Sequence, residues 1–332
     1  MKRKNLVNIV CQDNGSGLSV DASIIGNALS HNQFNTLWLK RNSPKLSWLR
    51  AKRFKIHNIV LPKIKVNLFL ENIWPQWIPF AEFNILIPNP EWIKDEDIHL
   101  LERMDAVVCK TLAAAENIHS VHRNVQYSSF SSPDKFTIIP AAGRPVSALH
   151  IAGRSPYKGT KLILDLWMEH PEWPKLTIVQ RRIDEQSEFY EKSSVRPNID
   201  VITGFVEDIE ITRLQQQSAI NLAPSSIEGF GHSIVEAMSA GAIVITTDAP
   251  PMNELVKEGR GILVAAQIGN AVGLTNHYHV ISRSLEAAIE KVLTLSQEER
   301  LEIGISARQW YLLNNIEFSR NLNNILSKVI KN

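Results

Sequence analysis

Short apolar runs rich in β-branched residues alternate with helix-length segments along most of this chain. The alternation is typical of βαβ units, in which helices join parallel strands and cover both faces of the sheet. A first series of expected strands lies at 6–10, 36–39, 56–61, 66–70, 83–87 and 106–109. A second series lies at 148–152, 176–179, 199–202, 219–222, 243–246 and 262–264. The pattern predicts an α/β fold with two parallel, Rossmann-like sheets, whose ligands would bind beyond the carboxyl ends of the strands.

The length of the chain, 332 residues, predicts more than one domain, because hydrophobic cores stop growing at about 250–300 residues. Gly143 and Pro145 interrupt both the strand period and the helix period between the two series. We therefore expect a Rossmann-like first domain over residues 1–145 and a second over 146–305. Residues 306–332 are expected to form a C-terminal helix that packs back toward the first domain, since apolar residues continue there at helical spacing.

Composition excludes several classes of protein. The chain is 44% hydrophobic and 21% charged, which favours a globular protein over a disordered one. No apolar run approaches the roughly 18 residues of a membrane-spanning helix, and the run at 6–10 is too short for a signal peptide. Two cysteines, Cys11 and Cys109, cannot form a disulfide scaffold or a cysteine metal site. We expect a cytoplasmic chain.

Charge is distributed unevenly. Residues 1–145 carry 18 Lys/Arg and 12 Asp/Glu, a net of +6, whereas residues 146–332 carry 18 and 22, a net of −4. No acidic residue lies between Asp21 and Glu71. Nine basic residues lie there, namely Lys40, Arg41, Lys45, Arg50, Lys52, Arg53, Lys55, Lys63 and Lys65. Such a stretch attracts anions, so by charge alone nucleic acid, an anionic glycan and an anionic inner membrane surface are all candidate partners of residues 40–65. Of these we expect the glycan or the membrane surface, and no nucleic acid. An ordinary solvated face is the alternative.

The most informative part of the chain is residues 224–241, PSSIEGFGHSIVEAMSAG. An expected strand leads into a loop with two glycines, and a helix is expected to begin near His232. Backbone N–H groups at a helix N-terminus form a ready anion site. Glu228 and Glu236, eight residues apart, flank that site, and carboxylates accept hydrogen bonds from sugar hydroxyls. Close packing of a Gly-rich turn is the alternative reading of the same residues.

This stretch resembles the Glu-x7-Glu signature of the retaining family-4, or group 1, glycosyltransferases, written around Glu-Gly-Phe-Gly and ending in Glu-Ala-Met-x-x-Gly. The resemblance extends, in the family's order, to residues 153–160, 202–206, 241–246 and 254–256, and so covers most of 148–265. It implies GT-B architecture, in which two Rossmann-like domains face a cleft and a helical tail follows. The first domain resembles the family only in outline.

The resemblance also implies roles for individual residues. Glu228 would hold hydroxyls of the donor sugar at the catalytic centre, Glu236 would hold the ribose, and Arg154 with Lys158 would neutralise the donor diphosphate. The spacing of Arg154 and Lys158 is shorter than in many relatives, so Arg181 or Arg182 is an alternative to Arg154. Position 232 is more often aliphatic in the family, and His232 departs from that pattern. The other implied donor-binding residues are Val206, Gly229, Phe230, Gly231, His232 and Ser233.

Two segments of the first domain are candidates for the acceptor side. Gly15, Ser16 and Gly17 occupy the place of the family's glycine loop after the first strand, with an ordinary tight turn as the alternative. Asn89 and Glu91 follow the strand expected at 83–87, near where relatives often have a His, and we take them as candidate catalytic residues. A turn fixed by the neighbouring prolines is the alternative there.

The function that the resemblance implies is transfer of a sugar from a nucleotide-diphosphate sugar to a hydroxyl of a glycan or lipid-linked acceptor, with retention at the anomeric carbon. It implies no cofactor and no bound metal, because Arg154, Lys158 and the amides of 229–233 would offset the diphosphate charge. His277 and His279, in an expected loop, lack the further ligands that a metal site needs.

Two other functions remain as alternatives: a nucleotide-sugar epimerase of the same fold and a non-catalytic protein that binds glycans or nucleotides.

Overall fold

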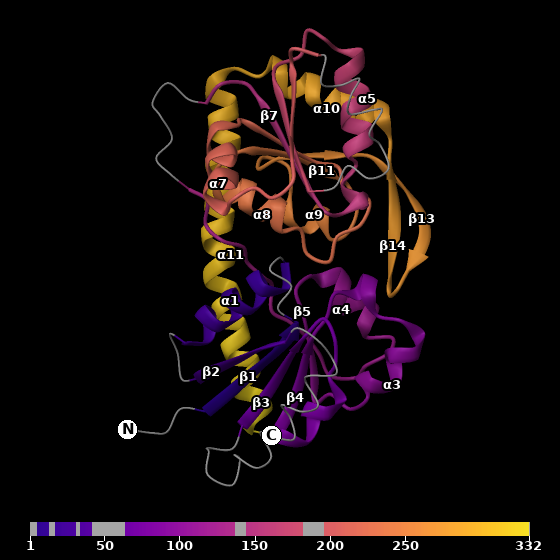
Figure 1. Ribbon diagram of the computed structural model, residues 1–332, viewed down its shortest axis with the longest axis vertical. Coiled ribbons are helices and arrows are strands. Elements are labelled where there is room, and N and C mark those ends of the chain that lie inside the picture. Colours follow the sequence, from indigo (N-terminus) through magenta and orange to yellow (C-terminus); the bar gives the residue numbers. More distant parts are fainter. Residues whose placement is uncertain are drawn as a thin grey trace. The chain divides into compact units, whose positions relative to one another are not determined.

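The computed structural model describes residues 5–12, 17–30, 34–41, 64–136, 144–181 and 196–331. By its internal contacts the chain divides into two units (Figure 1). Unit 1 comprises Met1–Ser132, Ala271–Thr275 and Asn314–Asn332, and unit 2 comprises Pro133–Asn270 and Asn276–Leu313. The strand expected at 56–61 lies outside the described residues, as do Gly15, Ser16 and Arg182.

Unit 1 is built on a parallel six-stranded sheet with strand order β2-β1-β3-β4-β5-β6. The strands are β1 (Asn5–Gln12), β2 (Phe34–Arg41), β3 (Ile64–Leu70), β4 (Ala81–Ile87), β5 (Ala106–Cys109) and β6 (Val125–Tyr127). Its helices are α1 (Gly17–Ser30), α3 (Ile98–Leu101) and α4 (Leu112–Ile118), with 3-10 turns η1 (Pro75–Phe80), η2 (Pro90–Trp92) and η3 (Asp95–Asp97). The order of the first five strands is that of flavodoxin-like sheets, which reverses between β1 and β3.

Three asparagines form a ladder across the buried middle of this sheet. Asn8, Asn67 and Asn84 are register partners on β1, β3 and β4. Asn8 Nδ2 donates to Asn67 Oδ1 at 2.8 Å, and Asn67 Nδ2 donates to Asn84 Oδ1 at 3.0 Å and to the carbonyl of Trp77 at 2.7 Å. A slip of one residue would turn each amide to the other face of the sheet and break these bonds. The ladder therefore fixes the register of the three strands.

The C-terminal helix α11 (Gln297–Lys331), yellow in Figure 1, is continuous over 35 residues, and its part from Asn314 onward belongs to unit 1. Phe318 is buried there, with its ring 4.9 Å from that of Phe130. Asn314 Nδ2 donates to the carbonyl of Phe130 at 2.7 Å, and Asn323 Nδ2 donates to the carbonyl of Ala28 at 3.0 Å. Both apolar packing and amide hydrogen bonds hold this part of the helix in unit 1.

Unit 2 is built on a second parallel six-stranded sheet, with strand order β12-β11-β10-β7-β8-β9. The strands are β7 (Ala148–Gly153), β8 (Leu176–Gln180), β9 (Ile199–Thr203), β10 (Ile220–Ala223), β11 (Ile243–Thr247) and β12 (Ile262–Val264). The connections contain η4 (Pro156–Lys158), α5 (Thr160–Glu169), α7 (Asp208–Gln217), α8 (His232–Ser239), α9 (Met252–Leu255) and α10 (Ser282–Thr294). This is the Rossmann order, and it reverses between β7 and β10.

The core of unit 2 lies on both faces of that sheet, as the near-continuous apolar strands require. Ile163 and Trp167 of α5, with Ile289 of α10, are buried in one cluster with strand residues on one face. On the other face Leu214 of α7 packs with Leu149 and Val179 of β7 and β8. No helix in the described part of the chain is both long and apolar enough to span a bilayer.

A two-stranded hairpin, β13 (Ala266–Val272) and β14 (Thr275–Val280), follows β12. The prediction of a loop for His277 and His279 is wrong, because both residues lie on β14. Most residues of the hairpin are only half-buried, so the apolar alternation that marks a strand in the sequence is weak here.

Candidate functional site

The donor-binding residues predicted from the sequence cluster at the switch point of unit 2. η4 follows β7, and the loop at 224–231 follows β10, so the two loops emerge where the strand order reverses. The backbone N–H of Ser226 donates to the carbonyl of Tyr157 at 2.8 Å, and the Ser226 hydroxyl donates to the same carbonyl at 3.1 Å. Gly159 has φ of 73°, and a Cβ there would lie 2.5 Å from the carbonyl oxygen of Pro224. Only glycine allows the two loops this close together.

Lys158 and Glu228 form an ion pair between these loops. Lys158 Nζ donates to Glu228 Oε1 at 2.5 Å, and the Ser225 hydroxyl donates to the same oxygen at 2.6 Å. The side chains are 17% and 9% exposed, so both groups are largely withdrawn from water. The structure therefore brings together two of the predicted site residues, and it adds Ser225, which was not among the predicted residues.

Helix α8 begins at His232, as predicted, and presents its N-terminus at the end of the same loop. Gly231 is its N-cap, with φ of 109°, and a Cβ there would lie 2.9 Å from Leu255 Cδ1. The N–H groups at the N-terminus of a helix attract anions. The Ser233 hydroxyl, buried in that first turn, has no hydrogen-bond partner among the described residues. Phe230, by contrast, is buried in the protein.

Glu236 lies one turn further along α8. Gln215 Nε2 donates to Glu236 Oε2 at 3.2 Å. Burial raises the pKa of Glu236 above its ordinary value, and the positive charge of Lys135 partly offsets that shift. Gln215 and Lys135 were not predicted, because only the folded chain brings them to the helix.

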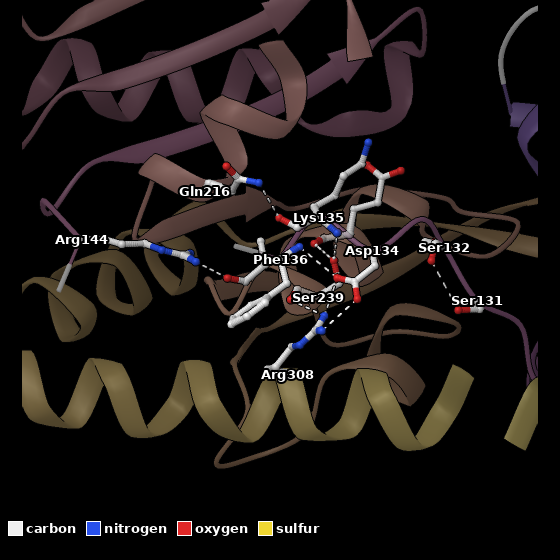
Figure 2. A network of polar contacts seen from close by, with 11 residues as sticks. Ser131, Ser132, Asp134, Lys135, Phe136, Arg144, Gln216, Ser239 and Arg308 are labelled. Atoms are coloured by element: carbon white, nitrogen blue, oxygen red, sulfur yellow. Dashed lines mark hydrogen bonds and ion pairs between the residues drawn. The ribbon is translucent and has the colours of Figure 1, made fainter. Parts of the chain in front are cut away.

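A polar network holds the C-terminal end of α8, as Figure 2 shows. The backbone N–H of Lys135 donates to the Ser239 hydroxyl at 2.9 Å, and that hydroxyl donates to the carbonyl of Glu236 at 2.7 Å. Lys135 Nζ forms a 2.6 Å ion pair with Asp208, although its own side chain is only 3% exposed. Arg308 binds both carboxylate oxygens of Asp134 and donates to the carbonyl of Ser239 at 2.9 Å. These contacts fix the helix that carries Glu236.

A buried histidine, His150, contacts the first residue of α5, just after η4. His150 Nδ1 lies 2.8 Å from the carbonyl oxygen of Leu222, and its Nε2 lies 2.9 Å from the hydroxyl of Thr160. Burial is the main cause that lowers the pKa of His150 to about 4; the charge of Lys158 acts in the same direction, and the hydrogen bond with the Leu222 carbonyl partly offsets the shift. The neutral ring joins β7 and β10 to the first residue of α5, directly after Gly159.

The other residues predicted to bind the donor make fewer polar contacts with the described residues. Arg154 is exposed and forms no hydrogen bond or ion pair with any residue that the structure describes. Val206 is half-buried against Leu149, Val179 and Leu214. Arg181 lies over the ring of Phe205, 4.9 Å from the ring centroid, at the ends of β8 and β9.

In unit 1 the predicted residues lie at the carboxyl edge of the sheet. Asn89 follows β4, and Glu91 lies half-buried in η2. Asn89 Oδ1 accepts from Lys110 Nζ at 2.9 Å, and Asn89 Nδ2 donates to Glu71 Oε2 at 3.0 Å. Gly17 is the first residue of α1. Within the described ranges no group of three or more His, Cys, Asp or Glu side chains is arranged to hold a metal ion.

Solved structures of other proteins share the fold of this chain. A glycosyltransferase from Rickettsia africae ESF-5 aligns over 100% of both chains, with a TM-score of 0.71 at 13% identity. Sucrose-phosphate synthase from Thermosynechococcus elongatus aligns over 98% of this chain and 99% of its own, with a TM-score of 0.74 at 14% identity. HepE from Anabaena, solved with UDP and glucose, has the same coverage and identity and a TM-score of 0.72. The fold is therefore that of the GT-B glycosyltransferases, as predicted.

Sequence comparison then gives the family. The model of the glycosyl transferases group 1 matches residues 134–310, more than half of the chain, and the chain belongs to this family. The lipopolysaccharide core biosynthesis mannosyltransferase LpcC of Rhizobium leguminosarum bv. viciae is 28% identical over 202 residues, 52% of this chain and 53% of LpcC. A GDP-mannose:cellobiosyl-diphosphopolyprenol alpha-mannosyltransferase of Xanthomonas oryzae pv. oryzae (strain PXO99A) is 45% identical over 56 residues, 17% of this chain and 15% of the relative. The match thus spans about half of the first relative and less of the second.

Proposed function

We propose that this chain transfers a sugar from a nucleotide-diphosphate sugar to a hydroxyl of a glycan or lipid-linked acceptor. The observation that carries the proposal is the group at the switch point of unit 2, where Glu228, paired with Lys158, lies in the loop that leads into α8 and Glu236 follows on that helix. A cation and the amides of a helix N-terminus suit a diphosphate, whereas carboxylates suit the hydroxyls of a sugar and a ribose.

Each group then has a task in the transfer. Lys158, the exposed Arg154 and the amides of 229–233 stabilise the negative charge that develops on the leaving diphosphate, so the reaction needs no metal and no cofactor. Glu228 is held through one oxygen by Lys158 and Ser225, which orients the carboxylate toward the hydroxyls of the donor sugar. The acceptor oxygen bonds to the anomeric carbon on the face from which the diphosphate departs, and the acceptor proton passes to the diphosphate. This path retains the anomeric configuration without a protein nucleophile.

The relatives suggest which substrates to try first. Both curated relatives are named as mannosyltransferases, and one is named for GDP-mannose, so GDP-mannose is the first donor to test. One relative is named for a lipopolysaccharide core and the other for a diphosphopolyprenol-linked acceptor. These names support an acceptor that is held at a membrane, reached by a cytoplasmic enzyme.

The test of the function begins with nucleotide binding. GDP, UDP, ADP and CMP, with and without mannose or glucose attached where the compound exists, are screened by thermal shift, because a bound donor stabilises the native state by mass action. Transfer to a lipid-linked or glycan acceptor is then followed by mass spectrometry of the product. A donor that is converted to its epimer without an acceptor would establish the epimerase alternative. If no nucleotide stabilises the chain, the proposed function is wrong.

We also propose that residues 40–65 hold the enzyme at an anionic membrane surface. Most of this stretch lies outside the described residues, but Lys65 is described and forms a 2.6 Å ion pair with Glu82. Near an anionic bilayer each free basic residue adds about 1 kcal/mol, and salt screens the attraction within about 8–10 Å. The proposal therefore rests on the basic residues other than Lys65.

Sedimentation with vesicles tests this part. Wild type should bind vesicles of phosphatidylglycerol at low salt and leave them at high salt. Changing Lys52, Arg53 and Lys55 together to Gln should abolish binding. A control with Arg320, Lys328 and Lys331 of α11 changed to Gln should bind like wild type. Equal loss in both triple variants would show a general charge effect, and no vesicle binding by wild type would reject the membrane contact.

A further inference from the structure

The carboxyl edge of the unit 1 sheet carries a chain of four polar side chains, of which only Asn89 was predicted from the sequence. It runs from Asp21, in the second turn of α1, through Lys110 after β5 and Asn89 after β4, to Glu71 after β3. The edge of an open parallel sheet at its carboxyl side, near the reversal of strand order, is where such folds bind ligands. Four side chains from separate segments therefore meet at the binding edge of this unit.

The inner end of the chain is a buried ion pair. Lys110 Nζ lies 2.6 Å from Asp21 Oδ2, and each side chain is only 4% exposed. The ring of Phe130 lies under the same ammonium group, 4.8 Å from the ring centroid. A buried ion pair costs desolvation, and removing one partner leaves an uncompensated buried charge. The buried pair is therefore fixed in place. Because Lys110 also donates to Asn89, it holds the Asn89 side chain in a defined position.

Asn89 transmits this fixed geometry to the surface. Its amide oxygen faces Lys110 and its amide nitrogen faces Glu71, so the orientation of the amide is determined at both ends. The backbone behind it is held as well, because the N–H of Leu274 donates to the carbonyl of Pro90 at 2.9 Å. Asn89 is thereby a bridge between the buried pair and the outer carboxylate.

Glu71 is the outer end of the chain and is half-buried. Its backbone has φ of 64°, a left-handed conformation that is unfavourable for a residue with a Cβ and is concentrated at functional sites. Asn89 donates to one of its carboxylate oxygens and Asn72 to the other, at 3.0 and 3.1 Å. Because an ionised carboxylate offers about four acceptor positions, room for further donors remains at this edge.

We propose that Glu71 binds hydroxyls of an uncharged sugar in the acceptor, and that Asn89, Lys110 and Asp21 are positioning residues for it. The inference rests on the proposed function and deepens it by naming the acceptor's chemical class at this point. Two carboxylates and one ammonium give the chain of residues a net charge of −1, which repels a phosphate or a carboxylate. Hydroxyl groups, which donate hydrogen bonds without bringing negative charge, are the complementary ligands.

Binding of small glycosides to the full chain tests the subsite without turnover. Methyl α-mannoside and methyl β-glucoside are the neutral probes, and mannose 6-phosphate is the anionic one, each followed by saturation-transfer NMR. In wild type, magnetic saturation should pass from the protein to a neutral glycoside. Mannose 6-phosphate should bind at least tenfold more weakly. Glu71→Gln keeps the size of the side chain but loses its charge and some of its acceptor positions. This variant should bind the neutral glycoside at least fivefold more weakly. Glu82→Gln, on the same sheet but paired with Lys65, is the matched control and should bind like wild type.

Kinetics separate this inference from the proposed function. In Glu71→Gln the acceptor KM should rise at least tenfold, while the donor KM and the slow hydrolysis of donor by water stay within twofold of wild type. Asn89→Asp, which replaces the donated N–H by a second carboxylate beside Glu71, should raise the acceptor KM similarly. If wild type binds nucleotide but no neutral glycoside, or if Glu71→Gln leaves the acceptor KM unchanged, the subsite is refuted and the donor site stands. If no nucleotide binds and no neutral glycoside binds, both proposals fall.

Discussion

The buried imidazole of His150 predicts that unit 2 loses stability as the pH falls through the range in which an ordinary histidine takes up a proton. The carbonyl of Leu222 can only accept, so Nδ1, 2.8 Å away, carries the ring proton. Nε2 of the neutral ring then accepts from the Thr160 hydroxyl. Protonation would place a second N–H against that hydroxyl and a charge in the core beneath Lys158. The native structure therefore holds the ring neutral.

The magnitude follows from the two pKa values. Burial lowers the pKa of His150 to about 4 in the native state, whereas an unfolded histidine titrates near 6.5. Below pH 6.5 the unfolded chain binds a proton that the native chain does not, so this stabilisation is complete above 6.5 and is lost as the pH falls toward 4. At about 1.4 kcal/mol for each pKa unit, His150 alone costs about 2 kcal/mol of unfolding free energy between pH 7.5 and 5.0.

Two measurements check this. The ring of His150 in isotope-labelled protein should remain neutral by NMR at pH 5.0. Between pH 7.5 and 5.0, the free energy of unfolding measured with urea should fall by about 2 kcal/mol more in wild type than in His150→Gln. His170→Gln is the control of opposite sign, because hydrogen bonds to Glu172 and Glu286 raise the pKa of His170 and make its contribution disappear as the pH rises. Titration of His150 near its ordinary pKa, or parallel pH profiles for wild type and His150→Gln, would refute the argument.

Three further predictions concern the donor site. Lys158→Ala and Glu236→Ala should each lower turnover more than tenfold without unfolding the chain, since a lost charge-assisted contact is worth about 1.5–3 kcal/mol; near wild-type kinetics would reject the assignment. Turnover should persist in excess EDTA, and loss with recovery on adding Mg²⁺ would contradict the proposed role of Lys158 and the α8 amides. Gly159→Ala should lower the unfolding free energy by at least about 1–2 kcal/mol, measured by urea unfolding, whereas Gly17→Ala, whose Cβ would meet nothing within 4 Å, should not.

The fold was predictable because both sheets are parallel and buried on two faces, which writes continuous apolar runs into the sequence. The start of α8 was also predictable, because its signal is local: the N-cap Gly231 and the first residues of the helix are neighbours in the sequence. The hairpin β13–β14 was missed because its residues are half-exposed and lack an apolar period. Local signals thus gave the elements that are buried or capped by neighbours in the sequence.

The parts of the site that were not predicted depend on partners far apart in the sequence. From the sequence alone Lys135 would be taken for an exposed surface residue. In the structure its side chain is buried and forms an ion pair with Asp208 of α7. Lys110 meets Asp21 across 89 positions, and no spacing rule connects them. Burial and charge compensation are properties of the folded chain, so a sequence shows the candidates for such pairs without showing which candidates meet.

Net charge over a long segment is therefore a poor guide to the charge at a site. Residues 1–145 carry a net of +6, which by itself favours an anionic acceptor. At the carboxyl edge of the unit 1 sheet, however, Asp21, Lys110 and Glu71 sum to −1, and the interactions there act at distances of about 3 Å, far shorter than the screening length. The excess of positive charge comes from the stretch at 40–65, in which Lys65 pairs with Glu82 rather than with this edge. The two proposals consequently name different partners: for the basic stretch an extended anionic surface, and for the edge at Glu71 the uncharged hydroxyls of a sugar.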